Sequence, residues 1–308
     1  MENIYRYNKL NEYYKNKFGE RVLKICIDGH FTCPNRDGKL STSGCIFCSE
    51  CGSGDHLAQF KDISAQVKDF FKSQRSTRAN KFIVYFQNFS NTYDSPDNLK
   101  KKYDGALIND KIIGISIATR PDCINEEIVK LLYSYTKKYY VAVELGLQTA
   151  NEKIGEAINR KYTNTQSTNA VKLLNKYQID VITHIMVGLP NETFDDIQNA
   201  VNFINQHQIQ GLKIHNTYVI KNTVLENMYM NGLYEPISLE YYLDCLVYIL
   251  SHISPDIVIH RVSGDAPKDL LIAPKWDLHK KWILNGLDKK LKDENLYQGI
   301  FYFISSLY

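Results

Sequence analysis

The sequence predicts an α/β fold built on a parallel β-sheet. Short apolar runs alternate with longer segments of helical periodicity, and about six such units follow one another along the chain. Each run ends in a polar or glycine-containing turn. Alternation of this kind is typical of parallel strands joined by right-handed crossovers. Six units can form an open doubly wound sheet or an incomplete barrel, and in both the functional side chains gather at the carboxyl ends of the strands.

The first strand is expected at 22–28, directly before a cysteine-rich loop. The later strands share its apolar character and lie at 82–86, 112–118, 141–145, 181–187 and 212–219. The segments between them repeat apolar residues every three or four positions, as Ile63, Val67 and Phe70 do, which predicts helices. These helices are expected at 63–74, 97–102, 126–135, 166–177 and 194–206.

The region after about residue 235 has a different pattern. It predicts a helix at 239–251, a short strand at 257–260 and a basic helix at 280–291. No stretch rich in Gly, Pro or Ser separates it from the preceding units. We therefore expect residues 1–235 to form the core with an N-terminal lead-in, and residues 236–308 to form an extension packed on it.

The composition is that of a globular protein. Hydrophobic residues make up 44% and charged residues 23% of the 308 positions, enough to bury a core. The 37 Lys and Arg against 34 Asp and Glu give a net charge of +3, which allows a nucleic-acid partner but does not indicate one. No run resembles a signal peptide or a membrane span. We expect a cytoplasmic protein without a membrane partner.

Four of the seven cysteines fall within one short loop. Two residues separate Cys45 from Cys48 and Cys48 from Cys51, whereas Cys33 stands eleven residues before Cys45. Close spacing in a cytoplasmic chain indicates metal ligands rather than disulfides. The spacing alone admits a structural zinc site with four thiolates or an iron–sulfur cluster. The isolated Cys33, and the loop's place after the first strand, favour the cluster.

A cluster held by three cysteines has a specific chemical use. One iron lacks a protein ligand and can bind the amino and carboxylate groups of S-adenosylmethionine (SAM). An electron from the reduced cluster then cleaves SAM and yields a 5′-deoxyadenosyl radical, while the protein supplies placement and exclusion of water. Because this use needs three ligands, Cys51 leaves the sequence ambiguous.

Several segments in order carry a family resemblance. They are CPNRDG, GCIFC, YFQNFSNTY, ATRPD, ELGLQTAN, INRKYT, HIMVGLPNET, KIHNTYVIKNT, IHRVSGDAP and LLIAPKW. With these, nearly the whole chain resembles the YhcC/YtqA-type family of radical SAM enzymes. Its core is also similar to the catalytic subunit of Elongator, whose relatives act on the wobble uridine of tRNA, although this chain lacks room for the acetyltransferase domain found there.

The resemblance implies a partial (β/α)6 radical SAM barrel with a C-terminal α/β extension. It implies that Cys33, Cys45 and Cys48 ligate a [4Fe–4S] cluster, with Cys51 a spare thiol, and that SAM is the second cofactor. The positions that match SAM contacts in related barrels are Phe47 near the adenine, Asn88, Ser90 and Asn91 near the methionine amino group, Gln148 at the ribose, Arg160 at the methionine carboxylate, and His184 and Gly188 near ribose and adenine.

Some of these matches have plain structural alternatives. The turn from Asn88 to Asn91 lacks the usual glycine-rich form. A lone Arg160 on a helix is commonly a surface ion-pair residue, and His184 in an apolar strand is commonly a hydrogen-bonded core residue.

Other polar residues are candidates for the substrate side of the cavity. Glu144 follows an apolar run and needs a partner if buried, for which Arg120 is the expected cation. The remaining candidates, equally compatible with structural roles, are Lys213, His215, His260 and Arg261. The scattered Cys26, Cys123 and Cys245 are expected to be buried as small hydrophobes, which argues against an auxiliary cluster.

The leading hypothesis is a radical SAM enzyme that modifies the wobble uridine of tRNA and takes its electron from an external donor such as flavodoxin or ferredoxin. No catalytic residue is assigned. The alternatives are a radical SAM enzyme for a small metabolite or peptide, and a zinc-stabilised binding protein. The C-terminal lysines either contact phosphates or form a solvated helix face, and they are Lys275, Lys280, Lys281, Lys289, Lys290 and Lys292.

Overall fold

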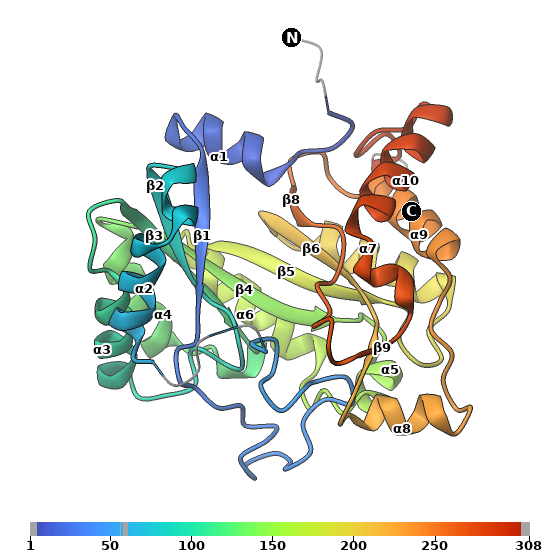
Figure 1. The fold of residues 1–308 in the computed structure, drawn as a ribbon, viewed down its shortest axis with the longest axis horizontal. Coiled ribbons are helices and arrows are strands. Elements are labelled where there is room, and N and C mark those ends of the chain that lie inside the picture. The colour runs from blue at the N-terminus through green and yellow to red at the C-terminus, as the bar shows by residue number, and fades with distance from the viewer. Residues whose placement is uncertain (1–4, 56, 58–60, 303–308) are drawn as a thin grey trace.

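Seven parallel strands form one curled sheet in the computed structural model, which describes residues 5–55, 57 and 61–302 (Figure 1). The strands lie in the order β1-β2-β3-β4-β5-β6-β8, so the sheet grows in chain order. Their bounds are β1 (Val22–Ile27), β2 (Lys81–Phe86), β3 (Ile112–Thr119), β4 (Tyr140–Gln148), β5 (Asp180–Val187), β6 (Gly211–Asn216) and β8 (Val258–Arg261). The predicted α/β class and partial barrel are confirmed, with one strand more than the six units expected.

Helices cover the outer face of the sheet, as the crossovers between parallel strands require. They are α2 (Ile63–Lys72), α3 (Pro96–Ala106), α4 (Glu126–Thr136), α6 (Asn164–Lys176) and α7 (Phe194–Gln206), followed by α9 (Leu239–His252) and α10 (Lys280–Asp293). Most begin where a polar side chain accepts a hydrogen bond from a backbone N–H of the first turn, as Asp62, Ser95 and Asn125 do. Short-range capping therefore sets the starts of these helices.

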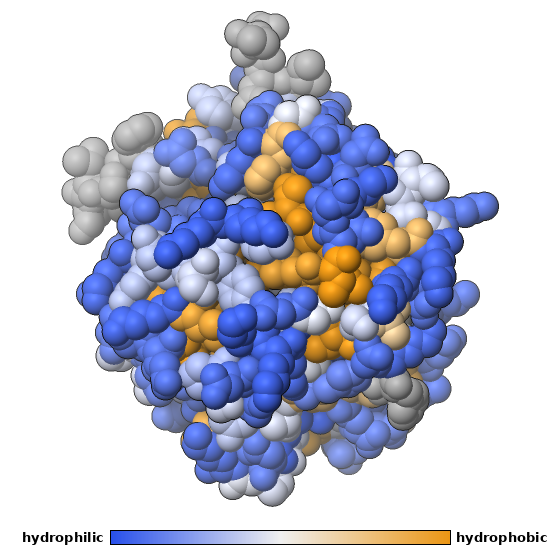
Figure 2. Space-filling view, turned by 90° about the vertical axis from the view of Figure 1, so that its left-hand side faces the viewer, coloured by the Kyte–Doolittle hydropathy of each residue, from blue (hydrophilic) through white to orange (hydrophobic). Residues whose placement is uncertain are grey.

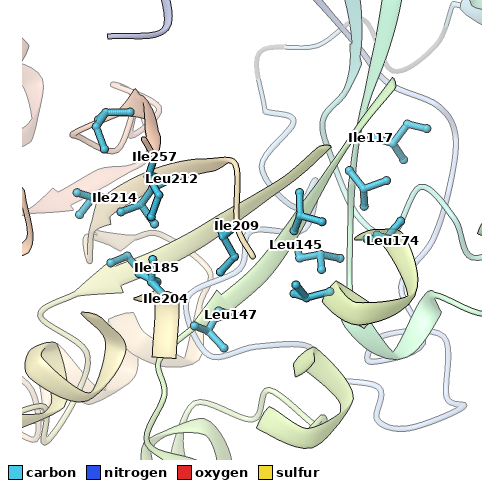
Figure 3. Close-up of a cluster of buried hydrophobic side chains, with 14 of the residues drawn as sticks. Ile117, Leu145, Leu147, Leu174, Ile185, Ile204, Ile209, Leu212, Ile214 and Ile257 are labelled. Carbon is cyan, nitrogen blue, oxygen red and sulfur yellow. The ribbon is translucent and has the colours of Figure 1, made fainter. Parts of the chain in front are cut away.

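The alternation of side chains along each strand separates the core from the inside of the curl. Leu145 and Leu147 of β4 pack against the helices in a large apolar cluster, part of which is drawn in Figure 3. Glu144 and Gln148 of the same strand point the other way and line a cavity inside the curl. Burying a Leu or Ile side chain stabilises a fold by about 1.5–3 kcal/mol, so the helix side of the sheet holds the structure together.

The predicted strand at 212–219 is wrong in its second half. The chain leaves the sheet after Asn216, and β7 (Val219–Ile220) pairs antiparallel with β9 (Leu271–Ala273) in a separate two-stranded sheet. The Asn216 side chain accepts a hydrogen bond from Gly264 N–H and donates one to Asp277. These contacts with the C-terminal region accompany the departure of the chain from the sheet.

Two parts of the chain have a place that the periodicity did not predict. Helix α1 (Leu10–Phe18) lies beside β1 and β8, the two edge strands, at the upper end of the molecule in Figure 1. Strand β8, expected in the extension, pairs with β6 and completes the main sheet. Two short helices were also not predicted, α5 (Glu152–Ala157) and α8 (Val224–Met230).

The expected boundary at 235 falls between α8 and α9, and residues 1–4 and 303–308 of the two expected segments lie outside the described residues. In the part of the chain that the structure describes, no helix has the length and apolar character needed to cross a membrane. The face drawn in Figure 2 is mostly hydrophilic, with a larger hydrophobic area right of the centre and a smaller one to its left.

Candidate active site

A cavity of about 380 Å³ occupies the inside of the curled sheet. The cysteine loop and the carboxyl ends of the strands form one part of its wall, and residues from the middle of the strands form the rest. We call the first part the mouth, defined by Cys33, Cys45, Phe47, Cys48 and Gln148. We call the second part the floor, defined by Lys24, Tyr85, Glu144, His184 and Lys213.

Three thiols of the cysteine loop, those of Cys33, Cys45 and Cys48, line the cavity, whereas Cys51 does not. Backbone hydrogen bonds shape the loop, among them Arg36 N–H to Cys33 O at 2.8 Å and Cys48 N–H to Cys45 O at 3.0 Å. The chemistry of this donor set fits a three-cysteine cluster with one iron free of protein ligands.

The loop is also tied to the segment after α5. The Asn35 carboxamide donates to Asn159 O at 2.6 Å and lies 3.6 Å from Cys45 Sγ. The Asn159 carboxamide donates to Gly44 O at 2.6 Å. Gly44 has φ of 71°, where a side chain would be strained, and its Cβ would lie 2.8 Å from Nε of Arg36. The glycine directly before Cys45 therefore allows this part of the loop to lie close against the Arg36 side chain.

The thiols have the properties expected before metal binding. Burial raises the pKa of Cys45 to about 12, with Cys48 adding to the effect, so iron binding would have to displace the proton. No three His, Cys, Asp or Glu side chains among the described residues are placed to hold a single metal ion. In a cluster each thiolate binds its own iron, which is a wider arrangement than one ion requires.

Of the eight predicted SAM contacts, four line the cavity: Phe47, Ser90, Gln148 and His184. The other four, Asn88, Asn91, Arg160 and Gly188, are not among the lining residues. Asn91 is buried, and its carboxamide donates to the backbone oxygens of Phe86, Asn88 and Ala118. It thereby joins the ends of β2 and β3 and shapes the mouth from behind.

Arg160 has a structural role in place of the predicted contact with the methionine carboxylate. Its side chain is 0% exposed, and its guanidinium donates to the backbone oxygens of Leu147, Thr149 and Tyr162. It also donates to Glu152 and Asn164, so all five N–H groups are used within the protein. This arginine fixes the carboxyl end of β4 and leaves no donor for a ligand.

The floor is built around Glu144, which is 0% exposed. Its Oε1 accepts from Ser116 Oγ at 2.6 Å and from Lys24 Nζ at 2.6 Å. Its Oε2 lies 2.8 Å from His184 Nε2 and also accepts from Lys213 Nζ. The prediction that Arg120 is the cationic partner of Glu144 is wrong.

Arg120 instead pairs with Asp122 at 2.8 Å and donates to the backbone oxygen of Arg160 at 3.0 Å. Arg120 lies just beyond the end of β3 and close to Asp122 in sequence. Glu144 is opposite Ala118, nearer the middle of the sheet, which explains why Arg120 pairs with Asp122.

Burial and charge set the protonation of the floor. Burial opposes ionisation of Glu144, yet attraction to Lys213 and Lys24 holds its pKa well below the usual value. Burial also opposes the charge on Lys24, but the carboxylate leaves its pKa raised. For Lys213 burial prevails and lowers the pKa to about 7. Burial and the charge of Lys213 lower the pKa of His184 to about 4.

The remaining predicted candidates have mixed outcomes. His215, His260 and Arg261 line the cavity with Lys213, whereas Cys123 and Cys245 are buried as expected. Cys26 is not buried as predicted: its thiol lines the cavity, because it lies on the inward face of β1 with Lys24.

Among the C-terminal lysines, three form ion pairs within the protein. Lys280 pairs with Asp265, Lys290 with Glu240 and Asp244, and Lys292 with Asp288. These pairs fit the solvated helix face that was one of the two interpretations of this segment.

Two floor residues, Lys24 and Tyr85, and Ser116, which donates to Glu144, were not predicted from the sequence. A lysine inside the otherwise apolar run VLKICI was a usable signal, because a charged residue in a central strand needs a buried partner. Tyr85 and Ser116 carry no such signal, because hydroxyl residues are common in strands.

Two family models match the chain. The model of the radical SAM superfamily matches residues 39–204, and the radical SAM C-terminal domain matches residues 209–293. The uncharacterized protein YtqA of Bacillus subtilis is 36% identical over 305 residues, which cover 96% of this chain and 93% of YtqA. Elongator complex protein 3 of Drosophila melanogaster is 31% identical over 166 residues, covering 52% of this chain and 29% of that protein.

A solved structure has the same fold. The archaeal Elp3 of Methanocaldococcus infernus, with an N-terminal deletion, superposes with a TM-score of 0.67 and 15% sequence identity. The superposition covers 92% of this chain and 68% of that one. At this level of identity the likeness concerns the fold.

Proposed function

The chain belongs to the radical SAM superfamily, and we propose that it cleaves SAM reductively at a [4Fe–4S] cluster to begin modification of the wobble uridine of tRNA. Enzymes of this superfamily use a [4Fe–4S] cluster and SAM. An external electron donor is needed, for which a flavodoxin or a ferredoxin is the class we propose. We expect the reaction to take place in the cytoplasm.

The observation that carries the proposal is the set of three thiols on one cavity wall. Cys33, Cys45 and Cys48 would hold the cluster, and Cys51, outside the cavity lining, would remain a free thiol. When bound, such a cluster supplies an open iron for SAM and the electron that generates a 5′-deoxyadenosyl radical. The protein's own part is to bind and orient SAM and to keep water away from the reacting atoms.

Four side chains of the cavity wall would contact SAM in this proposal. Phe47 precedes the third cysteine and offers a ring to the adenine, while Gln148 ends β4 and offers its carboxamide to the ribose. Ser90, in the turn after β2, and His184 of β5 line the same space. With Arg160 fully engaged elsewhere, we assign the methionine carboxylate to Arg120, one of the arginines that line the cavity.

The tRNA part of the proposal is supported by the 31% identity with Elongator complex protein 3 over 52% of the chain. That support is by analogy, since a fold hosts many substrates. A small metabolite or a peptide is the alternative substrate, and the experiment below separates these outcomes.

Anaerobic reconstitution tests the chemistry, and a deletion strain tests the substrate. We expect about four irons and four sulfides per chain, together with reductant-dependent release of 5′-deoxyadenosine from SAM. One zinc ion per chain without SAM cleavage would refute the proposal that the protein is a radical SAM enzyme. Nucleoside analysis of tRNA from the deletion strain should show loss or change of a wobble-uridine derivative. An unchanged profile would remove tRNA as the substrate and leave the small-molecule or peptide alternative.

A further inference from the structure

The floor lies deep in the curled sheet, away from the cysteine loop. Glu144 precedes Gln148, the last residue of β4, by four positions, which corresponds to about 13 Å of extended strand. Lys213 precedes the end of β6 by three positions, about 10 Å. The residues of the floor and of the mouth line the same cavity, as does Leu10 of α1.

The floor carries more cations than anions. Lys24 and Lys213 share the carboxylate of Glu144, and His184 and His215 add imidazoles rather than negative charge. Arg261 also lines the cavity, paired with Asp265 at 2.8 Å. One buried carboxylate for two ammonium groups leaves an excess positive charge in a place where water screens it poorly.

The hydrogen bonds of the floor are as one-sided as its charge. Both oxygens of Glu144 already accept two bonds each, from Ser116 and Lys24 on one side and from His184 and Lys213 on the other. His215 Nε2, by contrast, is buried without a hydrogen-bond partner among the described residues, and so is His260 Nδ1. Lys213 donates to Glu144 and to Tyr85 Oη and keeps a third N–H for a ligand oxygen, whereas a ligand N–H would find the carboxylate occupied.

We propose that the floor is the subsite that binds an anionic oxygen group of the substrate, a carboxylate or a phosphate. The ligand would become the second counter-ion of the Lys24–Glu144–Lys213 group, with Lys213 as its main contact. This inference rests on the proposed function, because it assumes that the substrate enters the barrel beside SAM. Burial lowers the pKa of Lys213 to about 7, and a bound anion would favour its charged form.

A thermal-shift experiment on the reconstituted holoenzyme tests the subsite. The enzyme is saturated with SAM without reductant, and its Tm is followed with sodium acetate or sodium phosphate against sodium chloride of equal ionic strength. We expect a saturable rise of roughly 2–5 °C with the matching anion. Acetate and phosphate distinguish a carboxylate from a phosphate ligand.

Matched variants locate the effect. Lys213→Met should abolish the rise, and Lys213→Gln should do the same if the first variant folds poorly. Lys281→Met, which removes an exposed lysine of α10, should keep it. No rise with either anion, or a rise that persists without Lys213, would overturn the subsite. A rise that occurs only when SAM is absent would also overturn it, because the anion would then occupy the place of the SAM carboxylate.

The two proposals fail separately. The thermal shift needs no reductant, whereas SAM cleavage is measured by release of 5′-deoxyadenosine after reduction. Cleavage without an anion-dependent shift refutes the subsite alone. A shift without cleavage refutes the proposed function and leaves the anion site standing.

Discussion

The mouth and the floor of the cavity are built in opposite ways. The three cysteines of the mouth come from one segment of sixteen residues, from Cys33 to Cys48. The floor takes Lys24, Tyr85, Glu144, His184 and Lys213 from five different strands, spread over most of the sheet.

Their hydrogen bonding differs as well. Behind the mouth, the Asn88 carboxamide and Asn35 Oδ1 are buried outside the cavity lining and have no hydrogen-bond partner among the described residues. At the floor, Glu144 accepts from four donors. The unpartnered groups near the mouth are amides, whereas at the floor four donors saturate one carboxylate and two ammonium groups share it.

Replacing a cysteine of the mouth should have the largest effect on activity. Cys45→Ala should lower cluster iron and SAM cleavage by more than about 100-fold, since the open-iron chemistry needs all three thiolates. Cys51→Ala is the matched control and should retain both. Iron analysis and 5′-deoxyadenosine release measure the outcome. Equal losses in the two variants would mean that Cys51 is a ligand.

Removing the central charge of the floor should cost stability first. Glu144→Gln leaves Lys24 and Lys213 buried side by side without their carboxylate, which should lower the free energy of unfolding by about 3–5 kcal/mol. Glu235→Gln, at an exposed position, should change it by less than about 0.5 kcal/mol. Urea denaturation provides the measurement. Wild-type stability in Glu144→Gln would contradict the shared ion pair.

Arg160 tests whether a residue predicted to bind SAM instead supports the fold at the end of β4. Arg160→Lys keeps the charge but cannot make five hydrogen bonds, so the free energy of unfolding should fall by about 2–3 kcal/mol. The affinity for SAM, measured by equilibrium dialysis below the unfolding transition, should change less than about threefold. A large loss of SAM affinity at wild-type stability would restore the ligand role.

His184 should make the free energy of unfolding depend on pH, and this is the smallest of the expected effects. Its pKa of about 4 lies below the usual value, so the unfolded chain binds the extra proton first and acid favours unfolding. The groups that face it are Glu144 of β4, Lys24 of β1, and Lys213 and His215 of β6. The free energy of unfolding should fall by about 1.5 kcal/mol between pH 6.5 and pH 5 through this group.

The pH test uses a neutral replacement. His184→Gln should show a shallower fall over this interval, measured by urea denaturation at each pH. His279→Gln, a histidine that stacks on Trp282 at the start of α10, is the control and should keep the wild-type slope. Identical slopes in wild type and His184→Gln would show that this imidazole does not set the acid response.

The sequence by itself determined the order of most strands and helices, because hydrophobic periodicity and helix capping act over a few residues. It also marked the cysteine loop as a metal-binding segment, since ligands for one centre can lie close together on a loop, whereas the choice of three cysteines among the four came from the family resemblance. The split of 212–219 into β6 and β7 escaped it, because the contacts of Asn216 come from Gly264 and Asp277, far along the chain.

Only the tertiary structure decided which charges meet. Glu144 pairs with Lys24 and Lys213, not with Arg120, because the inward faces of β1, β4 and β6 bring those side chains together inside the curl. The role of Arg160 was likewise decided by the tertiary structure. A buried guanidinium needs an acceptor for each of its N–H groups, and the backbone oxygens at the end of β4 are the acceptors within its reach. A loop motif is local in sequence, whereas the partners of a buried charge are fixed only when the sheet curls.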